Sequence, residues 1–306
     1  MKFFKIEGDR FLWFLALSLF FVTSFYFSLI KKETIILQAK RPDISVSPIP
    51  TLVGNEPFPI LSAQGVVAID PDSGVSLYEK GADLNLLPAS TTKIMTALIA
   101  FEAYDLNDVV TISGPRVVGQ KMGLLWGEQI TVQNLLDGLL IYSANDAAEA
   151  LASHYEGGRE AFVARMNEKA KELHLINTHF VNPSGLEDVG HVSSARDLVR
   201  LAEIAMQDNR FASIVGTKEM VVTSTDEKFV HKLTNINELI GEVDGVLGVK
   251  TGWTENAREN LVSYIDRDGK KVFIALLGSQ DRFTETKELI EWIYSNYEWQ
   301  NLSYSP

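Results

Sequence analysis

Three short motifs contain side chains suited to nucleophilic chemistry, and the first is a serine three residues before a lysine. Ser90 and Lys93 lie at the expected start of a helix, where side chains three residues apart share a face. A serine hydroxyl becomes a good nucleophile when a base takes its proton, and a lysine kept neutral by burial or a second cation can be that base. Taken alone, the spacing is more simply explained by a helix N-cap, and Ser28 and Lys31 repeat it by chance.

The second motif, Ser143-Ala144-Asn145, falls at the junction of two expected helices. A hydroxyl there can relay a proton, and the Asn145 amide can hydrogen-bond a substrate amide. Serine and asparagine also cap helices, so in isolation the segment is most simply explained as a loop and a cap.

The third motif, Lys250-Thr251-Gly252, follows a strand-like run and is the most specific of the three. The glycine permits close approach of a substrate backbone, the Thr251 hydroxyl can bind a carboxylate, and Lys250 supplies a positive field. We expect this motif at the edge of a sheet.

Composition narrows the possible functions. The chain has 306 residues, 46% of them hydrophobic, with 28 basic against 40 acidic side chains and a net charge of −12. These values indicate a folded core and argue against nucleic acid as a partner. Without cysteine there is no disulfide or thiolate chemistry. No metal-ligand spacing occurs among the five histidines, so we expect no metal and no other cofactor; they are His154, His174, His179, His191 and His231.

The pattern along the chain predicts strands at both ends of a helical middle. A hairpin is expected over residues 65–69 and 75–78, then helices near 90–104, 131–142, 145–156, 158–173 and 194–208. Strands follow at 220–224, 261–265 and 272–277, with a final helix at 284–297. This order predicts an α+β fold, an antiparallel sheet flanked by helices with an inserted all-helical subdomain.

Before this domain, residues 11–30 form an uncharged run of 20 residues, about 30 Å as a helix, which predicts one transmembrane anchor. A cleaved signal peptide is the alternative, with a small-residue site near Val22-Thr23-Ser24. The anchor reading makes residues 1–10 a cytoplasmic N-terminus. Residues 31–61 are expected to be a proline-rich spacer, 62–300 the folded domain and 301–306 a tail.

The three motifs in this order resemble the active-site serine penicillin-recognising enzymes, and more closely the D-alanyl-D-alanine carboxypeptidase family of low-molecular-weight penicillin-binding proteins. The resemblance covers about residues 62–296. It is carried by the segments PASTTKIMT (88–96), SANDAA (143–148), NPSGL (182–186), SSARDL (193–198) and GVKTG (248–252).

The resemblance implies a D,D-peptidase domain that trims terminal D-alanine from peptidoglycan stem peptides through an acyl-enzyme on Ser90. It implies that Lys93 is the base, that Ser143 relays a proton, and that Lys250 keeps Lys93 neutral.

The same resemblance implies that Asn145, Thr251 and Gly252 bind substrate and that the backbone N–H groups of Ser90 and Trp253 form the oxyanion hole. β-Lactams would be covalent inhibitors. The domain would lie on the extracytoplasmic face of the cell membrane, held by a single span.

One departure concerns substrate choice, because Arg258 stands near a position where the family usually has glycine. Three alternatives remain open: a D,D-endopeptidase acting on peptidoglycan cross-links, a β-lactamase, and a catalytically silent wall-binding protein. Against a class A β-lactamase, the chain has no Glu-x-x-Leu-Asn segment to supply the deacylating carboxylate.

Overall fold

The computed structural model describes residues 5–36, 47–113 and 117–301, which divide into an N-terminal helical unit and a larger folded unit beginning at Ser47. The described residues of the N-terminal unit form one helix, α1 (Lys5–Ile36). Within it, Arg10–Ser28 is long and apolar enough to cross a membrane, a property that anchors and signal sequences share. The apolar run is therefore helical, and the helix continues beyond the residues expected to span the membrane.

A five-stranded antiparallel sheet forms the centre of the larger unit. Its order is β3 (Ser76–Lys80), β2 (Gly65–Ile69), β10 (Lys270–Ser279), β9 (Arg258–Arg267) and β8 (Val246–Thr254). The early hairpin therefore pairs with the late strands, which confirms the sheet that the sequence predicts. The strand carrying the third motif, β8, lies at the edge.

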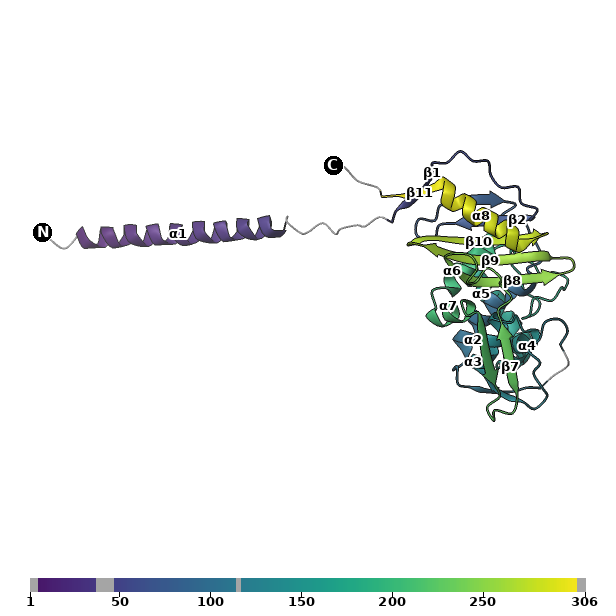
Figure 1. Ribbon diagram of the computed structural model, residues 1–306. Helices are drawn as coiled ribbons and strands as arrows, with labels where there is room; N and C mark the ends of the chain where they lie inside the picture. Colours follow the sequence, from purple (N-terminus) through teal and green to yellow (C-terminus); the bar gives the residue numbers. More distant parts are fainter. Residues whose placement is uncertain (1–4, 37–46, 114–116, 302–306) are drawn as a thin grey trace. The chain divides into compact units, whose positions relative to one another are not determined.

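Apolar cores cover both faces of this sheet. Successive side chains along a strand point to opposite faces, so neighbouring residues belong to different cores. Val67, Phe273 and Ala275 belong to the core shared with the helical part, whereas Val66 and Ile274 belong to a second core. Helix α8 (Arg282–Asn296) packs on the second core, and α6 (Ala195–Ala205) contacts β2 and β10 on the opposite face (Figure 1). The sheet thus separates two layers of helix, with apolar residues on both of its faces.

The part inserted between β3 and β8 is mainly helical and includes α6. Its other helices are η1 (Ala89–Thr92), α2 (Lys93–Ala103), α3 (Val132–Leu140), α4 (Asn145–His154), α5 (Gly158–Glu172) and α7 (Asn209–Val215). It also holds two small antiparallel sheets, β4 (Val109–Thr111) with β5 (Gln129–Thr131) and β6 (Glu219–Thr223) with β7 (Val230–Thr234). The expectation of an all-helical insertion is wrong in this respect. The strand expected at 220–224 is present as β6, but it pairs with β7 inside the insertion and not with the main sheet. The other three, β4, β5 and β7, have three to five residues, which leaves little periodicity to detect.

The structure also differs from the spacer expected over residues 31–61. Residues 37–46 lie outside the described residues, but β1 (Ile49–Leu52) pairs with β11 (Tyr297–Gln300). Phe58 then packs on Trp292 with ring centroids 4.6 Å apart, and the Trp292 indole N–H donates to the Glu56 carbonyl at 3.3 Å. Contacts with aromatic side chains hold this proline-rich segment on the domain. Residues 302–306 of the expected tail also lie outside the described residues.

Candidate active site

Ser90 and Lys93 meet at the entrance to helix α2. Residues Ala89–Thr92 form a single 3-10 turn and α2 begins at Lys93, so the side chains three residues apart are eclipsed. Lys93 Nζ lies 2.8 Å from Ser90 Oγ. Gly185 lies directly against this turn, since a Cβ on it would be 1.9 Å from the Ala89 carbonyl oxygen, and its φ of 84° also favours glycine.

Lys93 is fully buried and has three polar neighbours. Besides Ser90 Oγ, Nζ contacts Asn145 Oδ1 at 2.7 Å and the Ser184 carbonyl oxygen at 2.5 Å. Burial, and after it the positive charge of Lys250, holds the pKa of Lys93 well below its ordinary value. A neutral amine has two N–H donors and one lone pair. The two carbonyl-type oxygens take the donors, so the lone pair is left for the serine proton.

The second motif forms the side of the cleft next to this pair. Asn145 is the first residue of α4, and its Nδ2 donates to the Val118 carbonyl at 2.8 Å, so that Oδ1 faces Lys93. Ser143, with a left-handed φ of 62°, precedes the helix. Its buried Oγ has no hydrogen-bond partner within the described part of the chain. The Ser143 hydroxyl is therefore free to accept and pass on a proton.

The third motif forms the opposite side, on edge strand β8. Gly252 lies so close to the serine turn that a Cβ would be 2.9 Å from the Pro88 carbonyl oxygen and 3.2 Å from Ser90 N. Thr251 Oγ1 is buried and, among the described residues, has no hydrogen-bond partner. Glycine therefore allows the strand to approach the nucleophile, while the threonine hydroxyl remains free for a ligand.

Lys250, on the same strand, is fully buried, and its Nζ has one long contact, 3.3 Å to the Thr251 carbonyl oxygen. Burial lowers the pKa of Lys250 to about 7, with the Arg282 guanidinium as the next cause. Lys250 therefore changes charge near neutral pH, and in its charged form it opposes protonation of Lys93.

A cleft of about 610 Å³ joins the two sides. Of the eight predicted site residues, six line it: Ser90, Ser143, Asn145, Thr251, Gly252 and Trp253. The other two, Lys93 and Lys250, are buried behind its surface. The structure therefore brings into one site motifs that lie up to 160 positions apart in the chain.

Sequence reasoning missed Arg282 and gave no role to the 182–186 segment. Arg282 also lines the cleft, and its guanidinium donates to the Gly252 carbonyl at 3.1 Å. It is the first residue of α8, after β10, and no local motif marks it. Ser184 and Gly185 contact Lys93 and the serine turn through the backbone, so only the resemblance to known proteins drew attention to that segment.

Known proteins resemble this chain over about three quarters of its length. Residues 54–281 match the family model described as D-alanyl-D-alanine carboxypeptidase. The chain is 37% identical over 247 residues to D-alanyl-D-alanine carboxypeptidase DacF of Bacillus subtilis, covering 77% of this chain and 63% of that protein. It is 34% identical over 249 residues to DacB2 of Mycobacterium tuberculosis, covering 78% of this chain and 84% of that one.

Among solved structures, the Streptomyces K15 DD-transpeptidase superposes with a TM-score of 0.73 at 30% identity, covering 78% of this chain and all of that one. The predicted fold class is thereby confirmed. The chain belongs to the D-alanyl-D-alanine carboxypeptidase family of serine hydrolases.

Proposed function

We propose that this protein is a serine-type D-Ala-D-Ala carboxypeptidase that removes the terminal D-alanine from peptidoglycan stem peptides. The contact between Ser90 Oγ and Lys93 Nζ carries the proposal, because a buried lysine with a lowered pKa can take the proton of the serine hydroxyl and so activate it as a nucleophile. Family membership supplies the substrate class.

The reaction has two displacements. Lys93 takes the Ser90 proton as Oγ bonds to the carbonyl carbon between the two D-alanines, and the N–H groups of Ser90 and Trp253 stabilise the oxyanion. The carbon–nitrogen bond then breaks, and the proton passes through Ser143 to the departing amine of D-alanine. Water, deprotonated in the same way, hydrolyses the acyl-enzyme and restores Ser90.

The strand side binds the end of the substrate. Thr251 Oγ1 and the Lys250 charge face the terminal carboxylate, and Gly252 leaves room for the substrate backbone. Asn145 orients the substrate amide from the opposite side. The unpartnered Thr251 hydroxyl within the described part of the chain supports this role.

The α1 helix supports a placement for the enzyme. We propose that residues 11–30 anchor the chain in the cell membrane, that residues 1–10 are cytoplasmic, and that the catalytic unit works on the extracytoplasmic side. The uncharged run supports this arrangement, as does the location of peptidoglycan outside the cytoplasm.

A D,D-endopeptidase is the second candidate, favoured by one comparison. The chain is 31% identical over 243 residues to the D-alanyl-D-alanine endopeptidase of Escherichia coli, covering 78% of that protein. Both activities use the same nucleophile. Release of free D-alanine from a pentapeptide indicates the carboxypeptidase, and cleavage of a cross-linked peptide dimer indicates the endopeptidase.

The test uses the full chain in detergent, incubated with benzylpenicillin and examined by intact mass. We expect one covalent adduct on the wild type and none on Ser90→Ala, with D-alanine released from a pentapeptide by the wild type alone. Ser62→Ala is a matched control with an unchanged adduct, because Ser62 lies outside the cleft. An adduct that persists in Ser90→Ala would refute the assignment of the nucleophile.

A further inference from the structure

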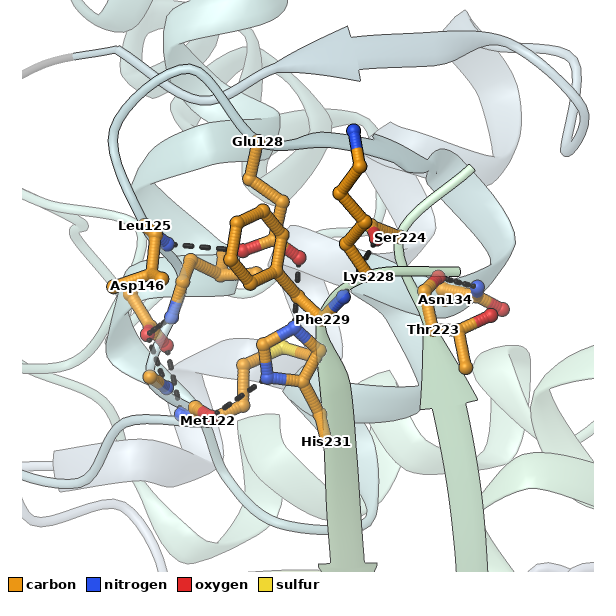
Figure 2. Close-up of polar contacts among 12 residues, drawn as sticks. Met122, Leu125, Glu128, Asn134, Asp146, Thr223, Ser224, Lys228, Phe229 and His231 are labelled. Carbon is orange, nitrogen blue, oxygen red and sulfur yellow. Dashed lines mark hydrogen bonds and ion pairs between the residues drawn. The ribbon is translucent and has the colours of Figure 1, made fainter. Parts of the chain in front are cut away.

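A buried histidine on the β6–β7 hairpin contacts the loop that forms one wall of the cleft. Its imidazole is 6% exposed, and its Nε2 lies 2.7 Å from Oε1 of the fully buried Glu128 carboxylate. On the other side of the ring, Nδ1 of this residue, His231, lies 3.1 Å from the Met122 carbonyl oxygen. Figure 2 shows the ring between these two partners. A carbonyl only accepts hydrogen bonds, so Nδ1 carries a proton and donates.

The loop in question, residues 117–125, is called here the cleft-wall segment. Asp146, in the first turn of α4, accepts from three of its backbone N–H groups, those of Met122, Gly123 and Leu124, at 2.9–3.1 Å (Figure 2). Glu128 accepts from the Leu125 N–H at 2.9 Å through the oxygen that does not face the histidine. Two carboxylates and one imidazole therefore hold the backbone of this segment.

The other end of the segment reaches the catalytic groups. The Val118 carbonyl accepts from Asn145 Nδ2 and the Gln120 carbonyl accepts from Asn145 N, both at 2.8 Å. Gly119 and Gln120 line the cleft. Asn145 Oδ1 in turn contacts Lys93 Nζ, so a displacement of this segment would change the position of Asn145 and its contact with Lys93.

We propose that His231 is a positioning residue for catalysis: by holding Met122 it fixes the cleft-wall segment, and through Asn145 it sets Lys93. This proposal rests on the proposed function. Neither the three motifs nor the family comparison assigns His231 a role, and the residue is 138 positions from Lys93 in the chain.

The hairpin does not depend on the histidine for its attachment. Asn134 Nδ2 donates to the Thr223 carbonyl at 2.9 Å, and the Thr225 N–H donates to the Gln129 carbonyl at 2.7 Å. A variant at His231 therefore keeps these tethers, and its effect on the cleft can be separated from loss of the hairpin.

The experiment compares three variants of the full chain in detergent. His231→Ala removes both contacts, whereas His231→Asn places an amide N–H near the position of Nδ1 and retains the donor to Met122. Lys228→Ala is the matched control, since this exposed lysine on the same hairpin pairs only with Asp226 among the described residues. Titration with benzylpenicillin counts active molecules, stopped-flow measurement gives the acylation rate constant per active molecule, and amide hydrogen exchange follows residues 117–125.

We expect His231→Ala to lose about tenfold in the rate constant per active molecule and to exchange about tenfold faster in the cleft-wall segment. His231→Asn recovers most of both losses, and Lys228→Ala changes neither. A merely stabilising histidine would lower the fraction of active molecules and leave the rate constant unchanged, which would overturn the proposal.

Failure of His231→Asn to recover the rate would also overturn it, since the Met122 contact would then not be the connection. If the wild type forms no adduct, the proposed function fails. Hydrogen exchange in the three variants still decides whether His231 holds the segment.

Discussion

Each side of the cleft buries one lysine, and the two lysines differ in how many hydrogen-bond partners their Nζ atoms have. On the helical side, Lys93 Nζ has three oxygen neighbours within 2.8 Å. On the strand side, Lys250 Nζ has one contact at 3.3 Å, and the nearby Thr251 Oγ1 and Arg282 Nε have no partner within the described residues.

This difference indicates that the two sides of the cleft have different roles. On the helical side, three hydrogen bonds hold Lys93 in place, while burial and the charge of Lys250 lower its pKa; only the Ser143 hydroxyl there lacks a partner among the described residues. The strand side holds buried donors that an anion would satisfy, and buried donors left unpaired are costly. In the proposed function, the first side carries out proton transfer and the second recognises the substrate carboxylate.

The largest effect is expected on the helical side. Lys93→Met keeps the length of the side chain and removes the base, so acylation by benzylpenicillin should fall by about a thousandfold or more. Stopped-flow measurement of adduct formation checks this expectation. The control Lys171→Met, at an exposed position of α5, should acylate at the wild-type rate. A Lys93→Met rate within tenfold of wild type would mean that another group accepts the serine proton.

An intermediate effect is expected on the strand side. Thr251→Val has nearly the same shape and lacks the hydroxyl, so kcat/KM for peptides with a free terminal carboxylate should fall about 10- to 100-fold. For the same peptides ending in a carboxamide, the two enzymes should differ by less than about threefold. Steady-state D-alanine and D-alaninamide release measures both. Equal losses on the two substrates would mean that Thr251 does not contact the carboxylate.

The smallest effect concerns stability. The pKa of Lys250 is lowered to about 7 in the folded protein, against about 10.4 in an unfolded chain, so between these values the unfolded state binds more protons. Wild-type stability therefore rises as pH increases from 7 toward 10. Lys250→Met removes the buried charge and should be about 1 to 2 kcal/mol more stable at pH 7, with the advantage shrinking as pH rises.

Urea unfolding at pH 7 and at pH 9.5 tests this, with the exposed Lys218→Met as control. An advantage that grows with pH would contradict the assignment of a lowered pKa to Lys250.

The sequence predicts the site residues on the helical side of the cleft more fully than those on the strand side. Ser90 and Lys93 are three residues apart, so helix periodicity alone places them together. Lys250 and Thr251 were found by their motif, and the edge position of β8 is confirmed. Arg282 could not be found, because its place in the cleft depends on how β10 and α8 return to the end of β8.

The same distinction explains the remaining differences in the fold. The proline-rich composition of residues 41–59 favours an extended spacer over residues 31–61, but contacts with Trp292 and β11 decide the position of residues 49–58. The cleft-wall segment has no regular structure of its own. Its backbone is held by Asp146 in α4, Glu128 just before β5 and His231 in β7, which are close in space and far apart in the sequence.

The β1–β11 ribbon is expected to open first when the chain is pulled from its N-terminal side. Tension on the chain before Ile49 enters at the residue paired with Gln300, and four residue pairs stand between that point and the end of the ribbon at Leu52. Parting them releases roughly 14 Å of chain at about 3.4 Å per residue and leaves the five-stranded sheet paired. A pull on the N-terminal side would thus be spent on this ribbon before it disturbs the strand that carries Lys250.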